Sequence, residues 1–103
     1  MARYEAAGYR VVARNWRCPL GELDLVLVRG PTLIFCEVKT RSGSALGGGY
    51  EAVGWQKQRK LQHLAEAFLA ASAVLADEVR FDVATVALAL DGGLTVHVFE
   101  SAF

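Results

Sequence analysis

The sequence has no excess of charge of either sign, because its 11 lysines and arginines are matched by 11 aspartates and glutamates. A general attraction to polyanions is therefore not expected, and any site for nucleic acid must be a local patch. Cysteine is also scarce. Cys18 and Cys36 are too few for a disulfide framework, and neither has metal-site spacing to a second cysteine or a histidine. We expect reduced thiols and a cytoplasmic protein.

Long apolar runs are missing as well. The longest, residues 83–90, is interrupted by Thr85 and falls far short of the about 20 residues that a membrane span needs. The first residues form no apolar signal core. Hydrophobic residues make up 53% of the 103 residues and charged residues 21%, which is typical of a globular protein and excludes disorder. We expect one domain over residues 1–103, without a membrane segment. The high apolar content suggests a partly covered surface, as in a homodimer.

The hydrophobic pattern indicates a mixed α/β fold. Alternation, or apolar residues on both faces, predicts strands at residues 9–16, 21–28, 32–40, 79–90 and 94–99. Helical spacing of apolar residues predicts helices at residues 2–7 and 51–76, and the glycine-rich stretch 42–49 is predicted to be a mobile loop. The order α-β-β-β-α-β-β gives a mixed sheet flanked by helices, with a meander of three strands and a right-handed crossover.

Charged residues interrupt the apolar pattern of two neighbouring strands. Because side chains alternate along a strand, the second strand is expected to group on one face Glu22, Asp24, Val26 and Val28, and on the other Leu23, Leu25 and Leu27. In the same way, the third strand is expected to group Leu33, Phe35, Glu37, Lys39 and Arg41, with Cys36 on the opposite face. Buried charges need partners, so these faces are the first place to look for a site.

A hairpin centred near Gly30 would bring Asp24 opposite the segment Cys36–Glu37. Two converging carboxylates attract a hard cation, and a Mg²⁺ ion held in this way keeps positions for water and phosphate. With Lys39 beside them, the residues outline a site for phosphodiester hydrolysis. The alternative is a structural cluster of ion pairs at the edge of the sheet.

Basic side chains around this site are candidates for phosphate contacts. Arg41 and Lys57 are expected at its rim, and Lys57 is the better candidate because its helix begins beside the end of the third strand. Arg10, Arg14 and Arg17 are candidates for a second basic stripe, because strand spacing places Arg10 and Arg14 on one face, with a solvated edge as the alternative.

Glu22 has two interpretations. It is an additional ligand for metal or water, or it is an ion-pair partner for a basic side chain such as Arg14 or Lys39.

Several other polar and aromatic residues are assigned to structure. Arg59 and Lys60 are expected on a solvated helix face, with a DNA contact as the alternative. Arg80 and Asp82 are expected in a buried structural pair. Trp55 is expected in the core or at an interface, with stacking on a single strand of nucleic acid as the alternative. Histidines 63 and 97 lack the partners of a catalytic triad, and His63 is expected to be exposed.

The motif Asp24, twelve residues, then Glu37-Val38-Lys39 resembles the PD-(D/E)XK nuclease signature. A wider set of motifs resembles the bacterial YraN-like family, whose fold is similar to archaeal Holliday-junction resolvases. These motifs are Arg14-Asn15, Gly21-Glu22-Leu23-Asp24-Leu25, Phe35-Cys36-Glu37-Val38-Lys39-Thr40-Arg41, Lys57, Arg80-Phe81-Asp82-Val83 and Ala102-Phe103.

The resemblance implies a restriction-endonuclease-like fold and a metal-dependent nuclease. Mg²⁺ or Mn²⁺ would be bound by Asp24, Glu37 and the Val38 carbonyl, and Lys39 would position the attacking water. The implied substrate is DNA, branched or single-stranded, more than RNA. Members of the family begin with a longer first helix that carries a further glutamate. That glutamate would lie before Met1 here, and Glu5 does not match it, so we expect a truncated first helix.

Two functions therefore follow from the sequence. The first is a nuclease, favoured by the set Asp24, Glu37 and Lys39. The second is a catalytically silent protein with a nuclease-like fold that binds nucleic acid or serves as a scaffold, favoured by the unmatched glutamate and the neutral net charge.

Overall fold

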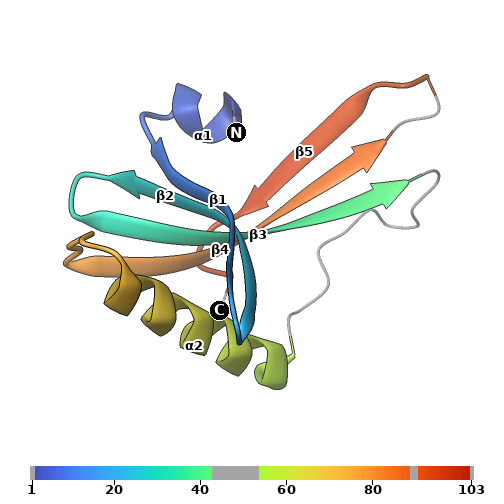
Figure 1. The fold of residues 1–103 in the computed structure, drawn as a ribbon. Coiled ribbons are helices and arrows are strands. Elements are labelled where there is room, and N and C mark those ends of the chain that lie inside the picture. The colour runs from blue at the N-terminus through green and yellow to red at the C-terminus, as the bar shows by residue number, and fades with distance from the viewer. Residues whose placement is uncertain (1, 43–53, 89–90, 103) are drawn as a thin grey trace.

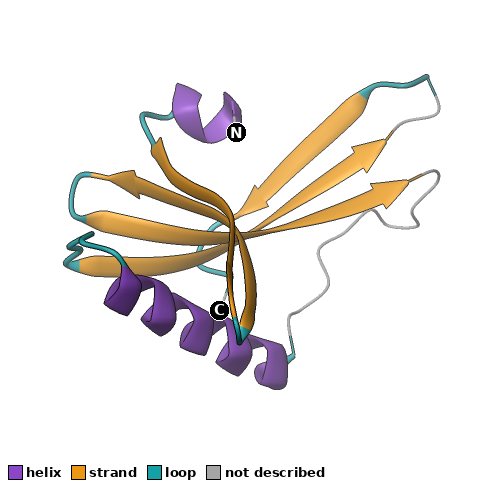
Figure 2. Ribbon diagram, viewed as in Figure 1, coloured by secondary structure: helices purple, strands orange, loops and turns teal. Residues whose placement is uncertain are grey.

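The structure, a computed structural model, describes residues 2–42, 54–88 and 91–102 (Figure 1). Their elements, in chain order, are α1 (Ala2–Ala6), β1 (Arg10–Cys18), β2 (Gly21–Arg29), β3 (Thr32–Ser42), α2 (Trp55–Ala71), β4 (Glu78–Leu88) and β5 (Leu94–Phe99). The strands form one five-stranded sheet, with α1 on one side and α2 along the other (Figures 1 and 2). The mixed α/β class that the sequence predicts is confirmed.

The sheet has the strand order β1-β2-β3-β4-β5. The first three strands form the expected antiparallel meander, β4 lies parallel to β3, and β5 returns antiparallel to β4. The turn between β2 and β3 contains Gly30 with φ of 55°, a left-handed conformation that glycine adopts without strain. The carbonyl of Pro31 in this turn accepts hydrogen bonds from the N–H groups of Asp77 and Glu78. These bonds fix the start of β4 beside the start of β3.

Helix α2 is shorter than the sequence pattern predicts. It ends at Ala71, where the N–H of Ser72 donates the last bond of the helix to the Phe68 carbonyl at 2.9 Å. Residues 72–77 then carry the chain back to the start of β4, so they cannot continue the helix. Val74 and Ala76 still pack against the core, which explains why the apolar pattern runs past the helix end. The rest of the prediction, residues 51–53, lies outside the described residues.

The other predicted boundaries differ from the structure by no more than two residues where they can be compared. Strand β3 reaches Ser42 and β1 reaches Cys18, each two residues beyond its predicted end, and β4 is described as far as Leu88. The remaining residues of the glycine-rich loop, 43–49, and residues 89–90 lie outside the described part of the chain.

Two apolar cores lie on the two faces of the sheet. On the α1 side, the buried residues are Tyr4, Tyr9, Leu25, Leu27, Ile34, Cys36 and Ala84. On the α2 side, they are Leu23, Val26, Leu33, Phe35, Leu64, Ala65 and Phe68. The alternation predicted for β3 is confirmed, because Leu33 and Phe35 face α2 whereas Cys36 faces α1.

A β-bulge around Val12 breaks the alternation of β1. Arg10 is paired with Val28, which packs on the α2 side, whereas Arg14 is paired with Leu25 on the α1 side. Directly paired residues share a face of the sheet. The prediction that Arg10 and Arg14 lie on one face is therefore wrong, because the extra residue of the bulge reverses the alternation between them.

A bend in the β1–β2 hairpin breaks the alternation a second time. Leu23 packs on the α2 side and Leu25 on the α1 side, although residues two apart normally share a face. Across the hairpin, Asn15 has a left-handed φ of 50°, and the tip of the hairpin turns toward α2 (Figure 1). The prediction that Leu23 shares a face with Leu25 and Leu27 is wrong for this reason. Asp24 lies at the bend.

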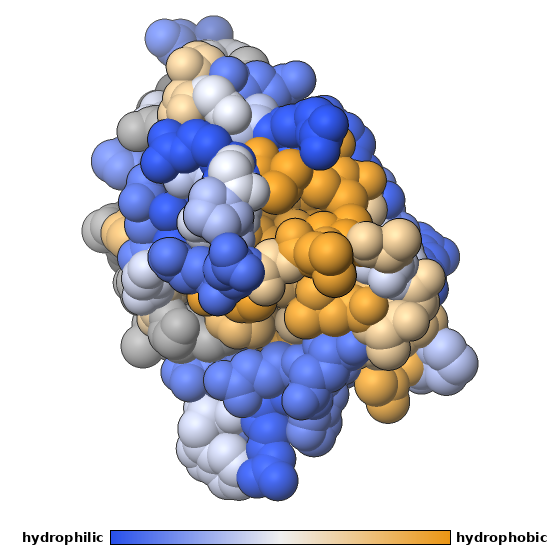
Figure 3. All heavy atoms as spheres, turned by 90° about the vertical axis from the view of Figure 1, so that its left-hand side faces the viewer, coloured by the Kyte–Doolittle hydropathy of each residue, from blue (hydrophilic) through white to orange (hydrophobic). Residues whose placement is uncertain are grey.

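One end of the molecule carries an apolar surface (Figure 3). A hollow there is lined by Val11, Val12, Val28, Val74 and Leu75, and Leu75 is 92% exposed. This surface agrees with the predicted partly covered face, and a homodimer remains a prediction. None of the described helices is both long enough and apolar enough to cross a bilayer.

Candidate functional site

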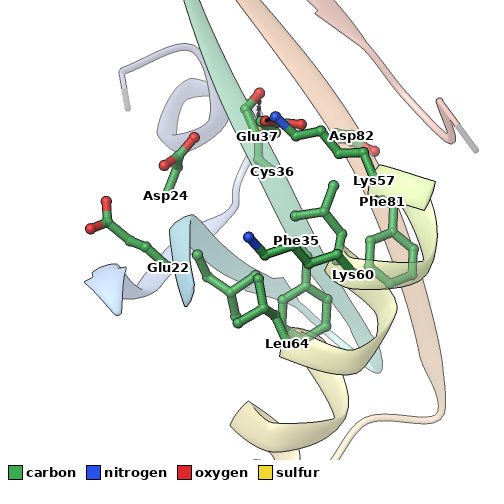
Figure 4. Close-up of a pocket in the computed structure, with 12 residues that line it drawn as sticks. Glu22, Asp24, Phe35, Cys36, Glu37, Lys57, Lys60, Leu64, Phe81 and Asp82 are labelled. Atoms are coloured by element: carbon green, nitrogen blue, oxygen red, sulfur yellow. Dashed lines mark hydrogen bonds and ion pairs between the residues drawn. The ribbon is translucent and has the colours of Figure 1, made fainter. Parts of the chain in front are cut away.

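The predicted site residues Asp24 and Glu37 line one cavity between α2 and the sheet (Figure 4). The cavity has a volume of about 130 Å³. Charged residues that line it are Glu22, Asp24, Glu37, Lys57, Lys60 and Asp82, and its floor is apolar, with Leu23, Phe35, Leu61, Leu64 and Phe81. Three strands thus supply carboxylates, and one helix supplies ammonium groups, to one small volume.

Asp24 is positioned where β2 separates from β3. The pairing of the two strands runs as far as Leu25 opposite Cys36, and Asp24 is the next residue of β2. Its Oδ2 accepts a hydrogen bond of 2.8 Å from the backbone N–H of Val38. Because β2 separates from β3 at this point, no backbone carbonyl of β2 pairs with the Val38 N–H in the ladder. The Asp24 carboxylate accepts this hydrogen bond in its place. Because the N–H and C=O of one strand residue point to the same neighbouring strand, the Val38 carbonyl also faces the Asp24 side.

Glu37 is held from the other side of the cavity. Its Oε1 lies 2.5 Å from Nζ of Lys57, and its side chain is only 12% exposed. Its second oxygen, Oε2, is buried and has no hydrogen-bond partner among the described residues. A buried carboxylate oxygen without a partner costs free energy. A cation in the cavity would supply the missing partner.

The remaining predicted residues divide into those near the cavity and those elsewhere. Glu22 lines the cavity, and its Oε2 pairs with Arg17 Nε at 2.6 Å. The predicted ion pair with a basic side chain is therefore confirmed, with Arg17 as the partner in place of the examples Arg14 and Lys39. Lys39 is half-buried on β3, and it is not one of the described residues that line the cavity. Arg14 is exposed and lines a second hollow together with Asp24. The side chain of Arg41 lies outside the described residues.

Lys60 is exposed, as its predicted place on a solvated helix face requires. It also lines the cavity, one helical turn after Lys57, and this position was not predicted from the sequence. The Lys60 side chain lies close to the backbone of Gly21 at the start of β2. A Cβ atom at this position would lie only 3.3 Å from Cε of Lys60, so the absence of a side chain at Gly21 makes room for the lysine. The signal in the sequence was the spacing of Lys57, Lys60 and Leu64, which places them along one side of a helix.

No group of three or more acidic, histidine or cysteine side chains with metal-binding geometry occurs in residues 2–42, 54–88 and 91–102. The candidate metal site therefore consists of two carboxylates, those of Asp24 and Glu37.

A second charged cluster is structural, as the sequence predicts for Arg80 and Asp82. Asp82 is fully buried, and its two oxygens accept bonds from Arg80 Nε and Nη2, both at 2.9 Å. They also accept bonds from the Tyr4 hydroxyl at 2.8 Å and the Ser101 N–H at 3.0 Å. The hydrogen bonds to Asp82 raise the pKa of Arg80 above its ordinary value, so the guanidinium stays charged. This cluster joins α1, β4 and the turn after β5.

Cys36 also lines the cavity, but its side chain is buried in the core on the α1 side of the sheet. Burial raises the pKa of its thiol to about 11, so the reactive thiolate is disfavoured. Burial likewise raises the pKa of Tyr4 well above its ordinary value, and the bonds to Cys36 and Asp82 add to the effect.

Comparison with known proteins identifies the family. A family model described as "Uncharacterised protein family UPF0102" matches residues 1–86. A UPF0102 protein of Frankia casuarinae is 45% identical over 103 residues, which cover 99% of this chain and 87% of that protein. A UPF0102 protein of Beutenbergia cavernae is 55% identical over 82 residues, covering 80% and 70%. One of Alkaliphilus metalliredigens is 37% identical over 99 residues, covering 96% and 85%. The resemblance to YraN-like proteins is confirmed at this level, and the chain belongs to the UPF0102 family.

Proposed function

We propose that the protein is a metal-dependent nuclease of the PD-(D/E)XK type, with a restriction-endonuclease-like fold, that hydrolyses phosphodiester bonds in branched or single-stranded DNA. The observation that carries the proposal is that Asp24 and Glu37 line one cavity, and that one buried oxygen of Glu37 has no hydrogen-bond partner among the described residues. A parallel β3–β4 pair joined through a helix, next to an antiparallel meander, supports the proposed fold.

The donor set fits a small hard cation. Mg²⁺ is commonly held by one or two carboxylates and keeps several waters in its shell. Asp24, Glu37 and the Val38 carbonyl would hold Mg²⁺ or Mn²⁺, and Glu22 would be a further ligand if it left Arg17. The bound ion would polarise the phosphate and lower the pKa of a bound water.

The chain's own residues would orient the reactants. Val38 fixes Asp24 through its N–H. Strand alternation places Lys39 on the same face of β3 as Glu37, so its ammonium group would orient the attacking water and offset charge on the phosphate. Lys57 and Lys60 line the same cavity and would contact phosphate oxygens.

One observation favours the second function, a silent protein that binds nucleic acid. The Lys57 ammonium lies 2.5 Å from Glu37 and already neutralises this carboxylate. In a silent protein, the contact would be a permanent structural ion pair, and the basic side chains would serve only in binding.

A cleavage assay separates the two functions. A labelled single strand and a labelled four-way junction are incubated with Mn²⁺ and the wild-type chain, Lys39→Ala, or the control Arg10→Ala, whose exposed side chain lies outside the cavity. The proposal expects cleavage by wild type and Arg10→Ala. Lys39→Ala should bind DNA without cutting it. Binding without cleavage by the wild type would establish the silent function, and equal cleavage by Lys39→Ala would exclude this site.

A further inference from the structure

Trp55, the first residue of α2, is 67% exposed. Its predicted place in the core is therefore wrong. The other tryptophan, Trp16, is half-buried and packs edge-on against Phe68, with 5.3 Å between the ring centroids. Trp55 instead offers its indole to solvent between two hollows of the α2 surface, and it lines both of them. An exposed indole beside a hollow is a surface on which another flat ring can stack.

Three basic residues follow this tryptophan in the first two turns of α2, although the whole chain has no net charge. Glu66 lines the hollow on the other side of the indole. Lys57, Arg59 and Lys60 are all exposed and lie within the first two turns of α2. The first turn contains no acidic residue, and the first acidic residue of the helix is Glu66. Cations near the positive end of a helix are electrostatically unfavourable. A bound polyanion would remove this cost, so the charge pattern is complementary to phosphates.

The exposed tryptophan is connected to the carboxylate cavity by side chains that line both. The hollow beside Trp55 is also lined by Leu20, Arg59 and Lys60, and Lys60 lines the cavity of Asp24 and Glu37 as well. Lys57 completes the connection through its ion pair with Glu37 (Figure 4). A continuous surface thus leads from the indole, along the side of α2, to the carboxylates.

We propose that this surface, formed by Trp55, Arg59 and Lys60 and called here the α2 track, binds a single-stranded polynucleotide. One base stacks on Trp55, and the neighbouring phosphates contact Arg59 and Lys60. A base inside a duplex is already covered on both faces, whereas an unpaired base has a free face for an indole. The inference rests on the proposed nuclease function, because it names the strand that the cavity would receive, but the binding itself needs no metal.

Tryptophan fluorescence tests the track in the presence of EDTA. The probe is oligothymidylate of about 12 nucleotides, within the site sizes typical of single-strand binding proteins, and a duplex of the same length is compared. We expect the single strand to quench the emission and to bind more tightly than the duplex. Trp55→Ala should abolish the quenching and weaken binding by about 5- to 150-fold, whereas Trp55→Phe should restore most of the affinity. The matched control is Leu75→Ala, which removes an even more exposed apolar side chain and should change neither quantity.

The charged half of the track is tested by salt dependence. Arg59→Ala and Lys60→Ala should each reduce the slope of log affinity against log salt by about 0.7, the value for one phosphate contact on a single strand. Arg10→Ala, on another surface, should leave the slope unchanged. Equal affinity of wild type and Trp55→Ala for the single strand, or preference for the duplex, would overturn the proposal. So would an absence of binding at low salt. Equal binding of oligouridylate and oligothymidylate would support the track and show that it does not distinguish RNA from DNA.

The binding measurements contain EDTA and no metal, so their results do not depend on catalysis. Combined with the separate cleavage assay in Mn²⁺, they distinguish the track from the nuclease. Binding that requires Trp55 in a protein that never cleaves would support the track and overturn the nuclease. Cleavage that is unchanged in Trp55→Ala, with unchanged strand affinity, would overturn the track alone.

Discussion

The backbone N–H of Val38 donates a 2.8 Å hydrogen bond to Oδ2 of Asp24 at the point where β2 leaves β3. The bond satisfies a strand N–H with a side chain and at the same time fixes a carboxylate at the edge of the cavity. The stability of the strand end and the proposed cation binding therefore both depend on the Asp24 carboxylate. Substitutions of Asp24 can separate the two contributions.

Asp24→Ala should destabilise the protein by about 1–3 kcal/mol, because the half-buried Val38 N–H loses its acceptor. Asp24→Asn keeps an acceptor oxygen and should cost less, while it removes the negative charge. Chemical denaturation measures both. Asp91→Ala is the matched control, because Asp91 accepts the same kind of bond from Gly93 on an exposed turn. An equal loss in Asp24→Ala and Asp91→Ala would contradict a special role for the strand bond.

Asp82→Asn should be far more damaging than the loss of a surface ion pair. The substitution leaves Arg80 with only Glu100 as an anionic partner, at 3.6 Å and 65% exposed, in place of an Asp82 side chain that is 0% exposed. Breaking a buried pair of this kind costs about 3–5 kcal/mol. Glu22→Gln breaks the Arg17 pair, in which the side chains are 34% and 79% exposed, and should cost no more than about 1 kcal/mol. Thermal melts of the two variants should differ clearly. Similar melting temperatures would show that the buried cluster contributes little.

Stability should fall as the pH rises through the alkaline range. In the folded protein, burial raises the pKa of Cys36 from 9.0 to about 11 and raises that of Tyr4 above 10.0. Below pH 9 both groups are protonated in both states, and their contribution is complete. At higher pH the unfolded chain ionises first, so the folded state loses stability as the pH rises through the range set by these values.

Denaturation midpoints measured from neutral pH to about pH 11 test this expectation. The double variant Tyr4→Phe, Cys36→Ala should show a shallower alkaline decline than the wild type, whatever its stability at neutral pH. Identical declines in the two proteins would contradict it.

Lys57→Gln should strengthen the binding of a divalent cation. Its ammonium group lies 2.5 Å from Glu37 Oε1 and competes for this carboxylate. Without it, a titration with Mn²⁺ should give a lower dissociation constant than in the wild type. Lys60→Gln is the control, because Lys60 lines the same cavity, and its loss should have a smaller effect. Weaker binding in Lys57→Gln than in Lys60→Gln would show that Lys57 supports the cation site and does not compete with it.

The strands and the convergence of the two motifs follow from local patterns in the sequence. The alternation of Leu33, Phe35 and Glu37 specifies which side of β3 faces α2, and the short turn at Gly30 specifies the pairing that brings Asp24 toward Glu37. Both features depend on neighbouring residues, so periodicity and turn chemistry were sufficient to predict them.

Long-range geometry accounts for what the sequence pattern could not predict. The bulge around Val12 and the bend at Asp24 reverse which face Arg10 and Leu23 occupy, and nothing in the apolar spacing signals an inserted residue. The end of α2 was placed too late, because Val74 continues the apolar pattern in a segment that is not helical. The Lys57–Glu37 ion pair depends on how α2 docks on the sheet, which no local pattern determines.

The central claim is that Asp24 and Glu37 together form one cation site, and a Mn²⁺ titration followed by electron paramagnetic resonance tests it most directly. The signal of free Mn²⁺ should fall as the wild-type chain is added. Asp24→Asn and Glu37→Gln should each remove this binding, and the double variant should lose nothing further, whereas Lys39→Ala should retain it. Wild-type protein that leaves millimolar Mn²⁺ entirely free, or single variants that each keep the wild-type affinity, would contradict the claim.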